Sequence, residues 1–298
     1  MTKPNLFNFA TSELSQDAFI CWILDHANPK HTNIDPELHN VAISIINRFL
    51  ELANEPQLTL PIDPDGFKVI RQFQNIDVLL IVNQYVFIIE DKTQTNVHSD
   101  QLNRYVKKIE DHTKYKNHKI IGIFFKPFDQ SNYDRIIKDN FYPFLRADLL
   151  TIFNQYPNIP NNIYQDFSQY IFNIENDVEA YKTKSFDEWK SRQKVGFLKA
   201  LQDKFSAINI VSNWSYVANP TGGFMNLYWG GQGDTNARQY LQLEISNQNE
   251  IKLNIRLSTP SKEETSPIRR KCIKFYENSF KNNEFNFIQH IKKVDRLG

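Results

Sequence analysis

The stretch that decides the fold of this chain consists of two apolar runs, Ile76-Asp77-Val78-Leu79-Leu80 and Val86-Phe87-Ile88-Ile89-Glu90-Asp91-Lys92. Their Val, Ile and Phe content predicts two β-strands, and the short polar connection at Asn83-Gln84 predicts a hairpin between them. Because side chains on a strand alternate between its two faces, Glu90 and Lys92 share one face and Asp91 takes the other. The hairpin then brings Asp77 beside Glu90 and Lys92.

Charged side chains at these positions indicate a catalytic or binding role rather than a contribution to folding. Strands disfavour aspartate, and burying Asp77 without a partner would cost several kcal/mol. Two carboxylates beside one ammonium suit a hard divalent cation and an attacking water, since Mg²⁺ prefers oxygen ligands. A lone Glu-x-Lys is most often a solvated charge pair, so the inference depends on Asp77, Glu90 and Lys92 occurring together. The cluster predicts hydrolysis of phosphodiester bonds.

The segments around the two strands predict a fold of mixed α and β elements. Apolar spacing and capping residues predict helices over 11–26, 36–53 and 99–111. Runs rich in Val, Ile and Phe predict strands over 67–73, 76–82, 86–91 and 119–125. Because a helix crosses over between the last two strands, we expect those strands to be parallel.

The rest of the chain changes pattern and predicts a second domain. Further helices are expected over 144–156, 164–181 and 185–205, strands over 208–217, 224–229, 240–246 and 251–257, and closing helices over 261–280 and 284–294. The change to a β-rich pattern predicts a boundary near 180–190. We therefore predict two domains, residues 1–182 and an α+β accessory domain over 183–298 that serves substrate recognition or oligomerisation.

Composition describes an ordinary folded protein, with 41% hydrophobic and 23% charged residues among 298. No apolar run reaches the length of a membrane helix and no secretory signal is visible, so we expect a cytoplasmic protein without membrane association. Two cysteines, Cys21 and Cys272, make no disulfide framework. Residues 1–184 hold 18 basic and 23 acidic side chains, and residues 185–298 hold 17 and 11. The basic part suits a polyanion, with ordinary variation between solvated surfaces as an equal alternative.

Residues 11–125 resemble the PD-(D/E)xK nuclease superfamily. That family carries an Asp on its second core strand and Glu-x-Lys on the third, and Asp77, Glu90 and Lys92 match this pattern in type, order and placement. Glu13 stands where several members have an acidic residue in the first helix, and Gln101 with Tyr105 fits the Gln-x-x-x-Tyr motif of the RecB-like branch. The proline of the family's name is absent, because Ile76 precedes Asp77.

The resemblance implies a restriction-endonuclease-like α/β/α core with a mixed sheet. It also implies an endonuclease-type hydrolase that depends on Mg²⁺, with Mn²⁺ as an alternative, and acts on nucleic acid, with DNA favoured. Restriction, repair and phage defence are the settings in which such proteins commonly act.

It further implies roles for the site residues. Asp77 and Glu90 would ligate the metal, and the carbonyl of Asp91 would add a backbone ligand. The Asp91 side chain itself departs from the family pattern, as a third acid at the edge of the site, and we expect it to face solvent. Lys92 would orient the attacking water or help to deprotonate it. Glu13 would ligate a second metal or hold a metal-bound water.

Gln101 and Tyr105 lie at i and i+4 on one helix face, where they would brace the site or hold the nucleic-acid backbone. An ordinary polar helix face is the alternative interpretation for this pair. The helix lies directly after the predicted Glu-x-Lys strand, which favours a role beside the site.

Several alternatives stay open. The chain could keep the nuclease fold without catalysis, as a nucleic-acid-binding or assembly subunit, or act on a small phosphoester, although no Gly-rich phosphate loop supports the latter. A basic patch, Arg269-Arg270-Lys271 with Lys274, is either a phosphate contact or a solvated helix face. Core packing is favoured over base stacking for the strand aromatics Trp214, Tyr216, Tyr228 and Trp229. A homo-oligomer or a partner subunit is compatible with the sequence.

Overall fold

The computed structural model describes residues 3–93, 100–220, 222–233, 238–259, 267–272 and 274. The chain divides into two compact units, Met1–Ala200 and Leu201–Gly298. The predicted boundary between residues 182 and 183 is not tested by this division and stays a prediction. In the described part of the chain, no helix combines the length and the apolar character that crossing a membrane requires.

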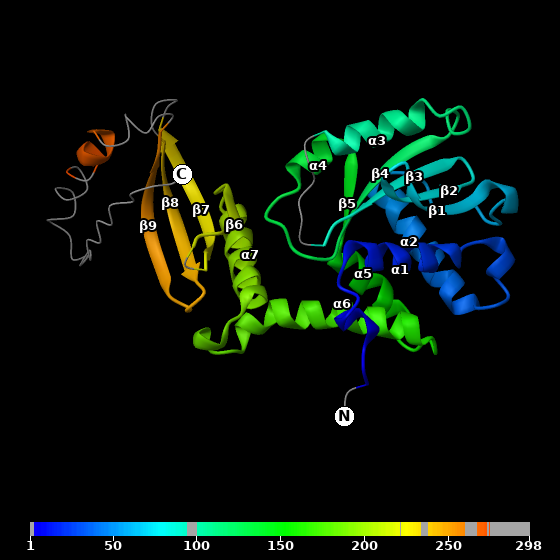
Figure 1. Cartoon of the computed structure of the whole chain (residues 1–298), viewed down its shortest axis with the longest axis horizontal. Coiled ribbons are helices and arrows are strands. Elements are labelled where there is room, and N and C mark those ends of the chain that lie inside the picture. Colours follow the sequence, from blue (N-terminus) through cyan, green and yellow to red (C-terminus); the bar gives the residue numbers. More distant parts are fainter. Residues whose placement is uncertain are drawn as a thin grey trace. The chain divides into compact units, whose positions relative to one another are not determined.

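Five strands form one mixed sheet in the first unit (Figure 1). They are β1 (Phe67–Phe73), β2 (Ile76–Val82), β3 (Tyr85–Asp91), β4 (Lys119–Lys126) and β5 (Phe141–Leu145). The strands lie side by side in chain order, with β1, β2 and β3 antiparallel and β3, β4 and β5 parallel. The predicted parallel pairing across the crossover helix is confirmed.

Helices cover both faces of this sheet and make three α/β/α layers (Figure 1). One face carries α1 (Glu13–Asp25), α2 (Pro36–Leu52), α5 (Arg146–Gln155) and α6 (Asn162–Glu179), and the other carries α3 (Gln101–Glu110) and α4 (Asp134–Lys138). Because both faces are covered, β2 and β3 are buried on both sides, which explains their almost unbroken apolar sequence. The predicted fold class is confirmed.

Short connections complete the first unit. Its 3-10 helices are η1 (Leu6–Asn8), η2 (Pro29–His31), η3 (Pro64–Gly66), η4 (Ala180–Lys182) and η5 (Phe186–Glu188). Helix α7 (Ser191–Ala207) then runs across the division between the units. The helix predicted over 185–205 therefore begins six residues later than expected, because residues 186–188 form the separate turn η5.

The helix predicted over 144–156 was wrong at its start. Residues Phe141–Leu145 form strand β5, and α5 begins only at Arg146. The aromatic run of β5 is typical of a strand, but Pro143 lacks a backbone N–H and would interrupt a central strand. It is tolerated because β5 lies at the edge of the sheet and pairs on one side only, with β4.

The second unit contains an antiparallel sheet of four strands in chain order. They are β6 (Ser212–Val217), β7 (Phe224–Gly233), β8 (Arg238–Ser246) and β9 (Ile251–Ser258). Trp214 is buried as predicted, whereas Tyr216 and Tyr228 are exposed, so the prediction of core packing was wrong for these two tyrosines. Residues 267–272 are helical, and the remainder of the two predicted closing helices lies outside the described residues.

Candidate active site

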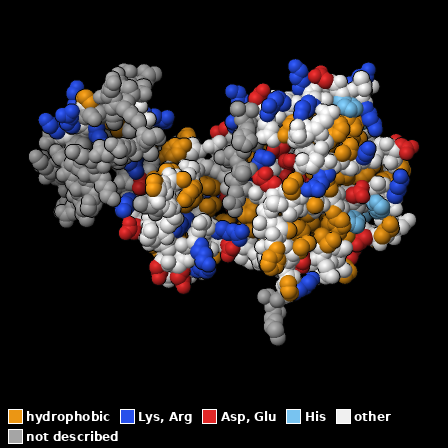
Figure 2. Space-filling model, in the orientation of Figure 1, with side chains coloured by type: hydrophobic (Ala, Val, Ile, Leu, Met, Phe, Trp, Pro, Cys, Tyr) orange, Lys and Arg blue, Asp and Glu red, His pale blue; other side chains and the backbone are white. Residues whose placement is uncertain are grey.

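Acidic side chains and one lysine meet where the β2–β3 hairpin reaches the rim of the sheet. The register of the hairpin pairs Val78 with Ile89, so the next positions outward are Asp77 on β2 and Glu90 on β3. Lys92 follows β3 directly, and its backbone N–H donates to the Phe125 carbonyl of β4 at 3.0 Å. Figure 2 shows acidic and basic side chains close together on the visible face of the first unit.

Lys92 is the centre of this cluster. Its Nζ lies 2.6 Å from Glu90 Oε1, 3.9 Å from Asp77 Oδ2 and 3.9 Å from Glu13 Oε2. It also donates to the backbone carbonyl of Asp91 at 3.1 Å. Burial alone would lower the pKa of Lys92, but the surrounding carboxylates outweigh burial and raise it. The lysine is therefore an ammonium at neutral pH.

Glu90 is fully buried and is held from α3. Gln101 donates from Nε2 to Glu90 Oε1 at 2.7 Å and to the Tyr105 hydroxyl at 2.8 Å. Burial raises the pKa of Glu90 to about 7, and the Asp77 carboxylate adds to this effect while Lys92 opposes it. Near neutral pH this carboxyl is therefore protonated in a substantial fraction of the molecules.

Asp91 differs from the expectation that its side chain faces solvent. The residue is fully buried, and Asp91 Oδ1 accepts a hydrogen bond from the Gln16 side chain of α1. Burial raises the pKa of Asp91 well above its usual range. Its backbone faces the cluster, since the Asp91 N–H donates to Asp77 Oδ2 at 2.9 Å and its carbonyl accepts from Lys92.

Glu13 joins the cluster from the first turn of α1, where Ser12 caps the helix. One carboxylate oxygen, Oε1, accepts from the Thr93 backbone N–H at 3.1 Å, and the other lies near Lys92. Six of the seven residues predicted for the site are therefore brought together by their side chains, and the seventh, Asp91, contributes its backbone. The six come from α1, β2, the end of β3 and α3 and are Glu13, Asp77, Glu90, Lys92, Gln101 and Tyr105.

Three further polar residues at the site were missed by the sequence analysis, namely Gln16, Asp17 and Gln72. Gln72 Nε2 donates to Asp17 Oδ2 at 3.0 Å and lies 3.5 Å from Asp77 Oδ1. Gln72 has a φ of 56°, in the left-handed region, so β1 bends at the level of Asp77. Burial, reinforced by Asp77, raises the pKa of Asp17 to about 6.

The sequence does contain a pattern that could have identified the site residues of α1. Glu13, Gln16 and Asp17 stand at i, i+3 and i+4, a spacing that places all three on one face of a helix. No comparable pattern identifies Gln72, because no turn residue or motif at this position predicts the bend in β1.

The donor atoms suit a hard divalent cation. No group of three or more His, Cys, Asp or Glu side chains forms a ready metal site within the described ranges. The Glu90 Oε2 atom is buried and, in the described part of the chain, has no hydrogen-bond partner. Together with Asp77 and the Asp91 carbonyl, it offers the oxygen ligands that Mg²⁺ prefers.

A mixed sheet between two helical layers, with Asp and Glu-x-Lys on neighbouring strands at its rim, is the arrangement of restriction-endonuclease-like nucleases. The chain belongs to the PD-(D/E)XK nuclease superfamily, whose family model matches residues 4–194. No similar protein was found among curated proteins, and no similar structure among solved ones. Membership of the RecB-like branch stays a prediction.

The raised pKa of Glu90 predicts how the stability of the metal-free protein depends on pH. Between the ordinary pKa of 4.5 and about 7, the folded state holds a proton on Glu90 that the unfolded state has released. The free energy of unfolding therefore falls as pH rises through this window. Urea unfolding in EDTA at several pH values measures the fall, which Glu90→Gln should make shallower. Equal slopes for the two proteins would contradict the assignment.

Proposed function

We propose that this protein is a Mg²⁺-dependent nuclease that hydrolyses phosphodiester bonds, with DNA as the favoured substrate and Mn²⁺ as an alternative metal. The observation that carries the proposal is the convergence of Asp77, Glu90 and Lys92 at one point of the sheet rim. Membership of a nuclease superfamily over residues 4–194 supports it. We further propose a cytoplasmic role in restriction, repair or phage defence, alone, as a homo-oligomer or with a partner subunit.

The chemistry divides between the metal and the protein side chains. A bound divalent cation would polarise the scissile phosphate and lower the pKa of a water. Asp77, Glu90 and the Asp91 carbonyl are the ligands that would hold it. Lys92 stays protonated, so its ammonium would orient the water and stabilise negative charge on the phosphate rather than act as a base.

The flanking residues support this arrangement in different ways. Glu13, fixed by Thr93, would hold a second cation or a metal-bound water. Gln101 would fix the rotamer of Glu90, because it donates to one carboxylate oxygen and leaves Oε2 for the metal. Tyr105 in turn bonds to the Gln101 amide.

A cleavage assay tests the proposed function. Supercoiled plasmid, single-stranded DNA and RNA are each incubated with the full chain in Mg²⁺, in Mn²⁺ and in EDTA. We expect metal-dependent cleavage that EDTA abolishes, with DNA cut in preference to RNA. Absence of cleavage on every substrate in both metals would overturn the proposal. Tight binding of nucleic acid without cleavage would instead identify a catalytically silent binding subunit.

Gln101→Ala is expected to reduce cleavage about 10- to 100-fold, the usual effect of losing a residue that orients a metal ligand. The physical reason is that Glu90 loses its donor on α3 and becomes free to change rotamer. Initial cleavage rates across a Mg²⁺ titration measure the effect, and part of it should be recovered at high Mg²⁺. Asn103→Ala on the same helix is the matched control, since its amide donates to the carboxylates of Asp100 and Asp139. Equal rates for both variants would exclude a role for Gln101.

A further inference from the structure

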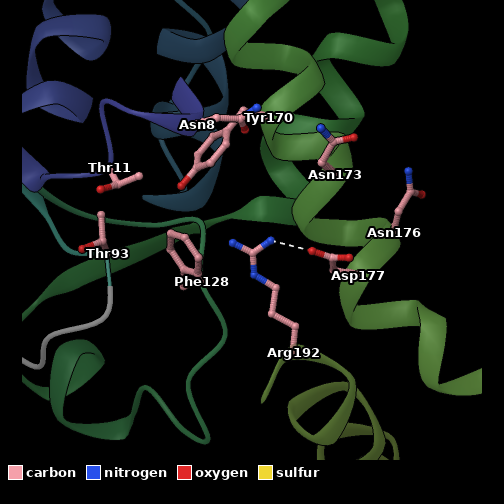
Figure 3. A pocket seen from close by; sticks show the side chains of 9 residues that line it. All are labelled: Asn8, Thr11, Thr93, Phe128, Tyr170, Asn173, Asn176, Asp177 and Arg192. Atoms are coloured by element: carbon pink, nitrogen blue, oxygen red, sulfur yellow. Dashed lines mark hydrogen bonds and ion pairs between the residues drawn. The ribbon is translucent and has the colours of Figure 1, made fainter. Parts of the chain in front are cut away.

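A cavity of about 710 Å³ lies in the first unit, beside the cluster of carboxylates. Its walls come from η1, the loop after β4, helix α6 and the start of α7 (Figure 3). The volume falls within the range of about 300–1,000 Å³ typical of sites that enclose a small molecule or a cofactor. Neither the family motif nor the carboxylate cluster accounts for this cavity.

The side chains around the cavity are aromatic and amide-bearing. Phe128 and Tyr170 contribute rings, and Asn8 and Asn176 contribute side-chain amides that have no hydrogen-bond partner in the described part of the chain. Arg192 also lines the cavity and lies 5.6 Å from the Phe128 ring centroid. These groups offer flat apolar faces together with hydrogen-bond donors and acceptors.

The charges on the described lining of the cavity cancel, although the proposed position of the substrate phosphate is close by. Among the described lining residues, the one guanidinium, Arg192, is paired with the one carboxylate, Asp177, at 2.8 Å (Figure 3). A site for a free phosphate would need unpaired cationic donors. The lining therefore fits the uncharged, flat and hydrogen-bonding part of a nucleotide, which is its base.

A buried arginine holds the walls of the cavity in place. Arg146 donates to the Pro127 carbonyl at 2.7 Å and pairs with Asp129 at 2.7 Å, so it grips the loop on either side of Phe128. It also pairs with Glu175 of α6 at 2.6 Å. Because the Arg146 side chain is only 5% exposed, this network fixes the Phe128 ring relative to α6 before any ligand binds.

Thr93 connects the cavity to the reaction centre. It lines the cavity, follows Lys92 directly in the chain and binds Glu13 through its backbone N–H at 3.1 Å. A strand whose phosphate lies against Lys92 would therefore have a neighbouring nucleotide at the mouth of the cavity.

We propose that this cavity binds one nucleobase of the substrate strand next to the scissile phosphate. The inference rests on the proposed nuclease function and adds to it a preference for single-stranded or unpaired nucleotides at that position. Phe128 would stack on the base, and the Asn8 and Asn176 amides would hydrogen-bond to its edge. Base–aromatic stacking is worth about 1–3 kcal/mol per base, which corresponds to about a 5- to 150-fold effect.

Abasic substitution tests the proposal. A series of single-stranded oligonucleotides, each with one abasic nucleotide at a different position around the cleavage site, is digested by the wild type. We expect an abasic residue at one flanking position to lower kcat/KM about tenfold or more. In Phe128→Leu and in Asn176→Ala, the intact substrate should be cut more slowly and the abasic penalty should shrink. Asn162→Ala, on exposed α6 surface outside the cavity, should keep the full penalty.

The outcomes separate the two proposals. An active nuclease that cuts every abasic substrate equally, or that shows the same penalty in wild type and in Phe128→Leu, overturns the nucleobase pocket and leaves the nuclease assignment intact. If free mononucleotides instead change the rate on every abasic substrate equally, the cavity binds a soluble effector and not the strand, which also overturns the proposal. A wild type without any cleavage refutes the nuclease assignment itself. The thermal unfolding midpoint of each variant, compared with that of the wild type, checks that the variant is folded.

Discussion

Replacing Asp77 with asparagine is expected to lower the cleavage rate by a factor on the order of 10³ while the fold persists, comparable to the loss of a group that stabilises the transition state directly. Asp77→Asn removes the negative charge that would hold the cation. In the wild type, the Asp91 backbone N–H donates to Asp77 Oδ2 at 2.9 Å. The asparagine amide oxygen can accept the same hydrogen bond, so the hairpin should keep its shape. Single-turnover cleavage rates and Mn²⁺ binding measure the two effects.

Asp65→Asn is the matched control for this prediction. Asp65 is exposed in η3, which precedes Phe67 and so lies at the opposite end of the β1–β2 pair from Asp77. The same chemical change there should leave both cleavage and metal binding unaltered. If Asp77→Asn retained wild-type cleavage, Asp77 would have no part in holding the metal, and the proposed site would have to be abandoned.

Lys92→Met is expected to abolish cleavage and also to destabilise the protein. The substitution leaves the fully buried Glu90 without the ammonium that lies 2.6 Å away. Removing one partner of a buried ion pair typically costs about 3–5 kcal/mol, because the other charge stays buried without compensation. The cost should be largest at pH 8 and smaller at pH 5, where Glu90 binds a proton and becomes neutral. Urea unfolding at both pH values in EDTA measures it.

The double variant Glu90→Gln/Lys92→Met provides the decisive comparison. Removing both charges leaves no uncompensated carboxylate at position 90, so the double variant should be more stable than Lys92→Met at pH 8, although it remains inactive. Additive losses of stability from the two single substitutions would show that Glu90 and Lys92 do not interact. Activity in the double variant would refute the proposed roles of both residues.

Local patterns were sufficient to predict the centre of the fold. The apolar runs of β2 and β3, their polar turn at Asn83-Gln84 and the period-two alternation of a strand were enough to bring Asp77 beside Glu90 and Lys92. The crossover helix was enough to predict that β3 and β4 are parallel. These features depend on neighbours that are close in the chain.

Other features depend on contacts between distant segments and were not predictable in this way. From the sequence, Asp91 is a third acid at the rim of the sheet. In the fold, the Asp91 side chain is buried and accepts a hydrogen bond from Gln16 of α1. Strand β5 escaped prediction because only its position at the sheet edge makes Pro143 acceptable. Gln72 enters the site through a backbone bend that no motif announces.

The sequence thus predicted which side chains form the candidate site, because strand alternation and helix periodicity act over a few residues. These side chains are Asp77, Glu90, Lys92, Glu13 and Gln101. Tertiary structure alone decided the protonation behaviour and the surroundings of that site. Burial raises the pKa of Glu90, and this burial depends on the packing of the whole first unit around β3. The walls of the cavity that Thr93 lines come from segments far apart in the chain, and Arg146 joins two of them, the loop after β4 and α6. Desolvation and cavity shape are properties of packed distant segments, which a linear pattern does not encode.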